Sequence, residues 1–360
     1  MAKTGRNLQE LAAEIERRAD AKRDFVAPTS RMEMTVVDNE ARLALATTNE
    51  VQAFGLNDLA HAHVADFANI PLAYYRRMQT EDPALLAKNV NRWFSGMADK
   101  RRMVRTLDGK VRAMLSDGYR ALENEDLAEA ILPVLMDMDL LIISCEITDR
   151  RLYLKAVDRS IERDIPTGKH MGDGGHTCFD TCSPAITISN SEVGGGALSI
   201  ETGVYTRACT NLMMIGTNMR KYHTGKRAEL SDEVYALLTD DTKKATDRAV
   251  WMQTRDLVKS AFDSAKFDAT AKKLGTAAGD VIEAEAVIEV IERVGKRFSL
   301  NEGERTGVLA ALIRDGDLTR YGLHSAVTRY SQEPGVSYDR ATELERIGGD
   351  IIEMEVAALA

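Results

Sequence analysis

The chain has 360 residues, of which 44% are hydrophobic and 29% charged, and its net charge is −9. Such a composition is typical of a globular protein with a buried core, of one large or two ordinary domains. No apolar run approaches 18 residues, which argues against a membrane-spanning helix, and four cysteines do not make a disulfide framework. The charged N-terminus lacks the apolar core of a signal peptide, so we expect a cytoplasmic protein.

The first part of the chain predicts one helix, one hairpin and a helical block. Apolar residues at helical spacing predict a helix over residues 8–23. Two strand-like runs within 32–48 join at the turn-forming pair Asp38-Asn39. A helical block follows over residues 57–94.

A second set of hairpins follows the helical block. Two extended runs within 101–115 flank Asp108-Gly109, the strongest short sequence signal for a hairpin. A helix is expected over 124–136, and two further strands over 140–147 and 151–157.

The segment 185–227 carries the most information about a partner. Three β-type runs lie within 185–210, and three consecutive glycines at 194–196 separate the first two. The segment then becomes basic, and no acidic residue occurs between Tyr205 and Arg227. In a chain of net charge −9, a purely basic stretch indicates a negatively charged partner, because binding responds to the local field.

Helical patterns replace strands after about residue 229. Residues 279–360 contain 16 acidic and 9 basic side chains, so most of the negative charge lies there. We predict an α+β fold, with an antiparallel, hairpin-rich sheet and inserted helices, followed by an all-helical C-terminal part. The expected regions are an N-terminal helix (1–30), an α+β body with basic hairpins (31–228) and an acidic helical C-terminal region (229–360).

Basic residues on the 101–115 hairpin alternate between its two faces. Residues two apart on a strand share a face, so such a basic ribbon can hold phosphate groups. The alternative is a solvent-exposed edge hairpin whose charges prevent edge-to-edge pairing. The candidate DNA contacts are Arg101, Arg102, Arg105, Lys110 and Arg112, with Tyr119 as a platform for base stacking.

A second basic patch follows the three glycines. Aromatic residues between cations suit single-stranded nucleic acid, because rings stack on bases while the cations hold the backbone. The alternative is a basic connection that pairs with the acidic C-terminal region of the same chain. The candidate contacts are Tyr205, Arg207, Arg220, Lys221, Tyr222 and Arg227.

Residues 158–184, rich in glycine and polar side chains, are interpreted as a loop. Four of them, His170, His176, Cys178 and Cys182, are the weak candidates for a zinc site, on which the alternative of a metal-dependent enzyme would depend. Their C-x3-C spacing differs from the usual C-x2-C pair, so we predict no metal and no cofactor. The phosphate-binding loop, the dinucleotide glycine motif, the nucleophile elbow and the zinc-protease motif are all missing, so nothing in the sequence argues for catalysis.

Three segments resemble a known group of proteins. They are SDGYRALENEDLAEAILPVL (116–135), ISNSEVGGGALSIETGVYTRACTNLM (188–213) and the C-terminal pair AVTRYSQE and YDRATELERIGGDII (326–352). The group is the phage/plasmid-like proteins classed as domain of unknown function 932, and the resemblance covers roughly residues 95–355. Its most specific parts are residues 190–194 and 209–211; where family members often continue with glycine, this chain has Leu212.

The resemblance implies a protein of phages, plasmids or prophages that works in the host-cell cytoplasm, with a Rad52-like annealing role and no established catalytic residues. We therefore predict a DNA-binding protein that promotes single-strand annealing or homologous recombination as a homo-oligomer, without a nucleotide cofactor. The acidic C-terminal region would dock a protein partner, or occupy the DNA groove when DNA is absent. The alternative is a self-assembling structural phage protein, in which the basic patch meets the acidic region of a neighbouring subunit.

Overall fold

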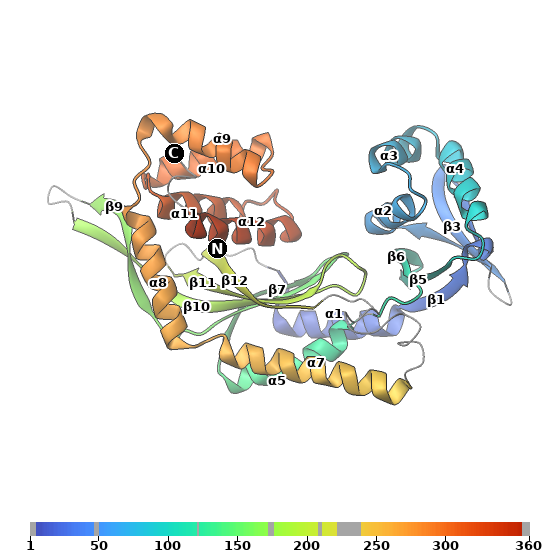
Figure 1. Ribbon diagram of the computed structural model, residues 1–360, viewed down its shortest axis with the longest axis horizontal. Coiled ribbons are helices and arrows are strands. Elements are labelled where there is room, and N and C mark those ends of the chain that lie inside the picture. The colour runs from blue at the N-terminus through green and yellow to red at the C-terminus, as the bar shows by residue number, and fades with distance from the viewer. Residues whose placement is uncertain are drawn as a thin grey trace.

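The computed structural model describes residues 5–46, 50–120, 122–171, 176–207, 211–221 and 239–354. Two six-stranded sheets lie in separate lobes, as Figure 1 shows. The small lobe consists of the described residues between 23 and 116, and the large lobe consists of the first helix together with the described residues between 124 and 354. The predicted α+β fold with a helical C-terminal part is confirmed, although the strands form two sheets.

The small lobe is a mixed sheet with three helices packed against it. Its strands are β1 (Arg23–Pro28), β2 (Met32–Val37), β3 (Glu40–Ala46), β4 (Val51–Leu56), β5 (Arg101–Leu107) and β6 (Lys110–Ser116), in the order β1-β5-β6-β4-β3-β2. Its helices are α2 (Asp58–Phe67), α3 (Leu72–Glu81) and α4 (Pro83–Gly96).

Neighbouring strands of the small-lobe sheet are antiparallel, except that β4 and β6 run parallel. A parallel pair needs a long crossover connection, and the block α2–α4 lies within it. The predicted hairpin turns are confirmed at Asp38-Asn39 and Asp108-Gly109, all four residues having positive φ. This left-handed backbone matches the twist of two-residue hairpins, which explains why Asn, Asp and Gly mark them.

The large lobe contains an antiparallel sheet, called here the large-lobe sheet. Its strands are β7 (Leu141–Ile147), β8 (Leu152–Val157), β9 (Arg163–Met171), β10 (His176–Asn190), β11 (Leu198–Thr206) and β12 (Asn211–Lys221), in the order β12-β11-β10-β8-β7. The strand β9 pairs with the first part of β10. The predicted loop at 158–184 is therefore wrong over β9 and β10, where two strands form a hairpin arm.

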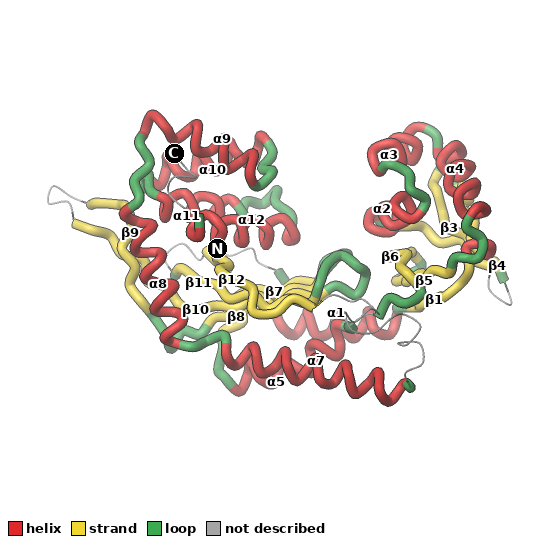
Figure 2. Tube along the Cα trace, in the orientation of Figure 1, coloured by secondary structure: helices red, strands yellow, loops and turns green. Residues whose placement is uncertain are grey.

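Helices cover both faces of the large-lobe sheet (Figure 2). One face packs on α1 (Leu8–Ala21), α5 (Asn124–Asp137) and α7 (Asp240–Ser260) through a large apolar core. The helix α8 (Ser264–Gly279) runs along the β9 end of the sheet, and the helices on the other side are α9 (Val287–Arg297), α10 (Glu302–Asp315), α11 (Arg320–Tyr330) and α12 (Tyr338–Glu353). Of these, α9–α12 share an apolar core of their own, which includes Val294, Leu312, Leu323 and Leu344.

The N-terminal helix is part of the large lobe. Its first turn is fixed by a capping box, in which Asn7 and Glu10 each accept a hydrogen bond from the other's backbone N–H. Its buried residues Leu11 and Ile15 join the core beneath the large-lobe sheet. Within the described part of the chain, no helix has the length and apolar character needed to span a membrane.

Candidate nucleic-acid interface

The turn between β10 and β11 is fixed by side-chain hydrogen bonds. The Ser191 hydroxyl donates to the carbonyl oxygen of Arg150 at 2.7 Å and accepts from the N–H of Gly195 at 2.8 Å. The Tyr119 hydroxyl donates to the Ser191 carbonyl oxygen at 3.2 Å, and the N–H of Gly194 donates to that hydroxyl at 3.1 Å. The three-glycine turn is thus an ordered part of the molecule, tied to the β7–β8 turn.

The glycines of this turn allow an arginine to approach it. A Cβ atom at Gly196, whose φ is 155°, would overlap the guanidinium group of Arg151. That group donates a hydrogen bond to the carbonyl oxygen of Ala197 at 3.1 Å. Gly194 has a φ of 74°, which side-chain-bearing residues rarely adopt. The turn therefore holds Arg151 at the end of the large-lobe sheet.

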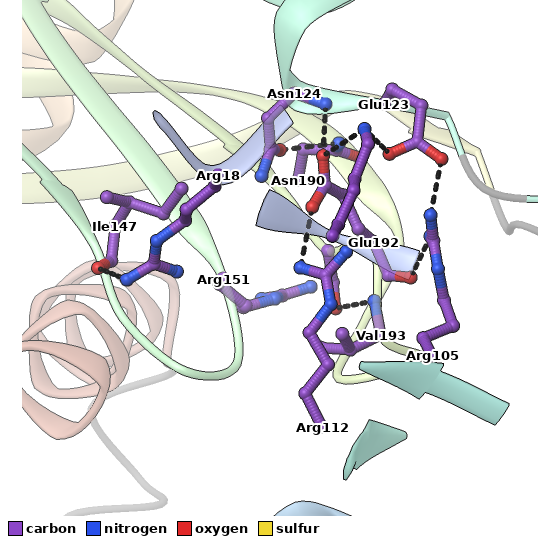
Figure 3. Close-up of polar contacts among 12 residues, drawn as sticks. Arg18, Arg105, Arg112, Glu123, Asn124, Ile147, Arg151, Asn190, Glu192 and Val193 are labelled. Atoms are coloured by element: carbon purple, nitrogen blue, oxygen red, sulfur yellow. Dashed lines mark hydrogen bonds and ion pairs between the residues drawn. The ribbon is translucent and has the colours of Figure 1, made fainter. Parts of the chain in front are cut away.

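The side chain of Glu192, next to the glycines, links the two lobes (Figure 3). Its carboxylate accepts from the Arg112 guanidinium on β6 at 2.9 Å and from the backbone N–H of Asn124 at the start of α5 at 2.8 Å. Its carbonyl oxygen accepts from the Arg105 guanidinium on β5 at 2.7 Å. The elements β5, β6 and α5 therefore meet at one buried acid that is at least 68 residues away in sequence.

Arg105 lies at the centre of this junction and is only 1% exposed. Its guanidinium bonds Asp24 at 2.9 Å and Glu123 at 2.7 Å, and Glu123 also pairs with Lys22 at 2.8 Å. Burial opposes the charge of Arg105, but the two carboxylates outweigh it and raise the pKa of the guanidinium. Burial likewise opposes ionisation of Glu123, but Arg105 and Lys22 lower its pKa to about 2.

Two predicted DNA contacts, Arg105 and Arg112, therefore lie inside the protein. All three guanidinium nitrogens of Arg105 are bonded to protein oxygens, and Arg112 is bonded to Glu192 through one nitrogen. Burial of both side chains keeps them from a phosphate group outside the protein. Strand alternation could not reveal this, because the acid that binds Arg112 is 80 residues away. Both residues join the lobes and are removed from the set of candidate DNA contacts.

The predicted stacking platforms are also not free rings on the surface. Tyr205 is 6% exposed and packs in an apolar cluster with Val157, Ala185 and Leu212. Tyr119 is half-buried, with its hydroxyl tied to the glycine turn, and burial raises its pKa. Tyr222 and Arg227 lie outside the described residues.

The remaining predicted cations lie at several places. Arg101 and Lys110 are exposed at opposite ends of the β5–β6 hairpin. Arg102 is half-buried, and its guanidinium stacks 3.9 Å from the centre of the Phe67 ring. Arg207 is exposed at the end of β11, 3.5 Å from Glu162. The structure does not bring all of the predicted contacts into one groove.

Strand register shows which cations share one end of the large-lobe sheet. Arg220 pairs with Ser199 and Lys221 with Leu198, at the start of β11, whereas Arg207 follows the end of that strand. The β7–β8 turn, which carries Arg150 and Arg151, lies at the same end as Arg220. We call the arginines Arg150, Arg151 and Arg220 the basic end.

None of the three arginines of the basic end forms an ion pair within the described part of the chain. Arg150 and Arg220 are exposed, and Arg151 is half-buried. Burial lowers the pKa of His63 on α2, and the positive charges of Arg150 and Arg102 lower it further. Arg102 of the small lobe and Arg150 of the large lobe therefore act on the same histidine. Arg150 and Arg151 were not predicted, although two arginines in a tight turn between strands are a visible signal.

The weak metal candidates do not form a site in the part of the chain that can be described. Cys178 and Cys182 both lie on β10, and four residues of strand separate them by about 13 Å, too far for one zinc ion. Burial raises the pKa of the Cys182 thiol to about 12. His170 and His176 pair into the β9–β10 ladder through their backbones. Among the described residues, no group of three His, Cys, Asp or Glu side chains is arranged to hold a metal ion.

Comparisons with known proteins gave no match, whether against family models, curated proteins or solved structures. The resemblance to the phage/plasmid-like proteins therefore stays a prediction, and the functional argument depends on the geometry of the site.

Proposed function

We propose that this protein binds single-stranded DNA at the basic end of the large-lobe sheet and promotes annealing or recombination. The observation that carries the proposal is the gathering of three arginines without ion-pair partners, among the described residues, at one end of a sheet. In a chain of net charge −9, this gathering produces a local positive field that attracts a polyanion.

The spacing of the arginines suits a nucleic-acid backbone. Arg220 lies on β12, and Arg150 and Arg151 lie on the turn just before β8; three inter-strand steps from β8 to β12 cover about 14 Å. At duplex spacing, a strand carries roughly four phosphates over that distance. Guanidinium groups bind phosphate oxygens in a bidentate manner, so neighbouring phosphates can be held in turn.

The shape of the site favours contacts to phosphates over contacts to bases. The arginines project from turns and strand ends, and no described helix at the basic end carries a row of them for insertion into a major groove. Phosphate contacts position a strand without reading its sequence. Sequence-independent binding of single strands is what annealing requires, and it agrees with the family resemblance.

Charge reversal at two exposed positions tests the proposal. The variant Arg150→Glu/Arg220→Glu should lose at least about tenfold in affinity for a fluorescent oligonucleotide. The slope of log affinity against log salt should fall by about 1.4, because two phosphate contacts are lost. The control Arg207→Glu reverses an exposed arginine at the opposite end of the sheet and should bind as the wild type does.

The same oligonucleotides provide the annealing assay. Wild-type protein should accelerate pairing of complementary strands, and the double variant should not. Wild-type binding that is absent or independent of salt would overturn the proposal, and so would equal losses in the double variant and the Arg207→Glu control.

A further inference from the structure

The large-lobe sheet has a polar face that is nevertheless buried. Directly opposite residues of antiparallel strands share a face, so register defines rows across the sheet. One row contains Tyr153, Ser189, Ser199 and Arg220. The next row contains Ser144, Lys155, Thr187 and Glu201. We call the side of the sheet that carries these two rows the polar face.

The helix α12 covers the polar face with matching polar groups. The ammonium group of Lys155 lies 2.6 and 2.9 Å from the two carboxylate oxygens of Glu345, and both side chains are at most 3% exposed. Arg346 forms a bidentate pair with Glu201, at 2.7 and 2.6 Å.

Hydroxyl groups complete this contact. The Tyr153 hydroxyl donates to the Asp339 carboxylate at 2.7 Å, and the hydroxyls of Tyr338 and Ser144 are 2.6 Å apart. The acidic groups of α12 therefore lie on the lysine and tyrosine of the sheet.

Stability alone does not explain why this face is covered. A polar alternate face is typical of antiparallel sheets that face solvent or a ligand on one side. A buried ion pair such as Lys155–Glu345 contributes little net stability, because desolvation offsets the attraction. The buried hydroxyls of Thr187 and Thr342 have no hydrogen-bond partner among the described residues, which is a further cost. The helices α9–α12 have an apolar core of their own, which does not depend on the polar face, while Tyr321 and Ile352 also pack against Met213 of β12.

The polar face is continuous with the basic end. Arg220 belongs to the same row as Tyr153, and Arg151 precedes Tyr153 by two residues, which places it on the same side. A DNA strand held at the basic end therefore reaches Tyr153 and then Lys155 without crossing the sheet.

We propose that the polar face is a second segment of the single-stranded-DNA site, and that α12 occupies it in the state described here. The carboxylates of Glu345 and Asp339 take the places of phosphate groups, on Lys155 and on the Tyr153 hydroxyl. When α12 is lifted, Lys155 binds a phosphate and the Tyr153 ring becomes available for base stacking. This inference rests on the proposed function, and the polar face would bind the same DNA single strand as the basic end.

Three variants of the full-length chain separate the covered state from the open one. Glu345→Gln/Asp339→Asn removes the two carboxylates, and Gly349→Ala adds a Cβ that would overlap the Met214 carbonyl oxygen of β12. Both should release α12 and raise affinity for an oligothymidine about tenfold, within the usual range of coupling between sites. The matched control Gly348→Ala places its Cβ against Thr328 on α11, within the helical unit, and should leave DNA affinity unchanged.

The third variant keeps α12 closed. Lys155→Met/Glu345→Leu replaces the ion pair by apolar side chains, which preserves the packing and removes the phosphate ligand. Its affinity should fall about tenfold below that of the wild type. In hydrogen exchange, saturating oligothymidine should expose the amides of α12 in the wild type and leave them protected in this variant. Cooperative thermal unfolding identifies any variant that fails to fold.

The outcomes distinguish the inference from the proposed function. If wild-type binding depends on Arg150 and Arg220, while α12 stays protected and the closed variant binds like the wild type, the inference is overturned and the proposed function stands. If neither wild type nor the released variants bind oligothymidine, the proposed function itself fails. If the released variants bind oligothymidine more tightly and the α12 amides exchange faster, the result supports both the proposed function and the inference.

Discussion

The two faces of the large-lobe sheet come from the same strands but are buried by different means. On one face, Leu154, Ile188 and Ile200 pack against apolar residues of α1, α5 and α7. On the other, Lys155 and Glu201 pair with charged residues of α12. The alternation of side chains along the strands decides which residues lie on each face. The helices that pack on a face decide whether that face is exposed to solvent. Burial and hydrophobicity are therefore separate properties of this sheet.

The largest effect on stability should come from breaking the buried pair on the polar face. Glu345→Ala leaves the Lys155 charge buried without a partner, so we expect a loss of about 3–5 kcal/mol in the free energy of unfolding. Lys155→Met/Glu345→Leu should be neutral or stabilising, because it also removes the desolvation cost. Urea unfolding of the two variants measures this. If both variants were destabilised equally, the loss of stability could not come from the unpaired Lys155 charge.

Truncation on the apolar face should cost nearly as much for a different reason. Ile188→Ala leaves a cavity between the sheet and its helices, with an expected loss of about 2–5 kcal/mol. Its DNA affinity should remain that of the wild type when measured below the unfolding transition, since this face takes no part in binding. A change of affinity without unfolding would show that the two faces are coupled.

The junction between the lobes offers a smaller, pH-dependent comparison. The pKa of Glu123 is lowered from 4.5 to about 2 in the folded protein. A carboxylate with a lowered pKa contributes stability above its unfolded pKa, and that contribution is lost as the pH falls through about 4.5 towards 2. Glu123→Gln should therefore be less stable than the wild type at pH 7 and show a weaker dependence over pH 2–4.5. If the stabilities of the wild type and of Glu123→Gln fell in parallel as the pH is lowered, Glu123 would not be the source of the pH dependence.

The smallest effect concerns two hydroxyls of the polar face. The Thr187 hydroxyl is buried without a hydrogen-bond partner among the described residues, so Thr187→Val should leave stability unchanged or slightly improved. The Ser189 hydroxyl lies 2.9 Å from that of Ser199, so Ser189→Ala should cost about 1 kcal/mol. Thermal unfolding of these two variants tests whether α12 leaves hydroxyl groups of the polar face without hydrogen bonds.

Local signals predicted local structure well. The hairpins at Asp38-Asn39 and Asp108-Gly109 were predictable because few residues adopt a left-handed backbone. The division into two sheets was not, because alternation marks a strand without naming its partner, and β4 pairs with the distant β6. The β9–β10 arm was interpreted as a loop, since glycine and polar residues there mask its pairing.

The candidate site was predicted less well than the fold. The basic charge of the chain near Arg220 was visible in the sequence, but the burial of Arg105 and Arg112 depends on Glu192, which only the tertiary fold brings near. The contribution of Arg151 depends on the turn that supports it. Charge patterns therefore identified a region, and tertiary contacts decided which of its arginines are buried in ion pairs within the described part of the chain.

The order of the elements along the chain has a consequence for biosynthesis. All helices and strands of the small lobe lie between residues 23 and 116, so this lobe can fold as it leaves the ribosome. The helix α1 is made before the small lobe, yet Leu11 and Ile15 are buried only by strands and helices that come later in the chain. Arg112 likewise waits until Glu192, 80 residues further on, has been added. The junction between the lobes therefore stays incomplete until the chain has grown past Glu192, so the small lobe can fold before the contact that joins it to the large lobe exists.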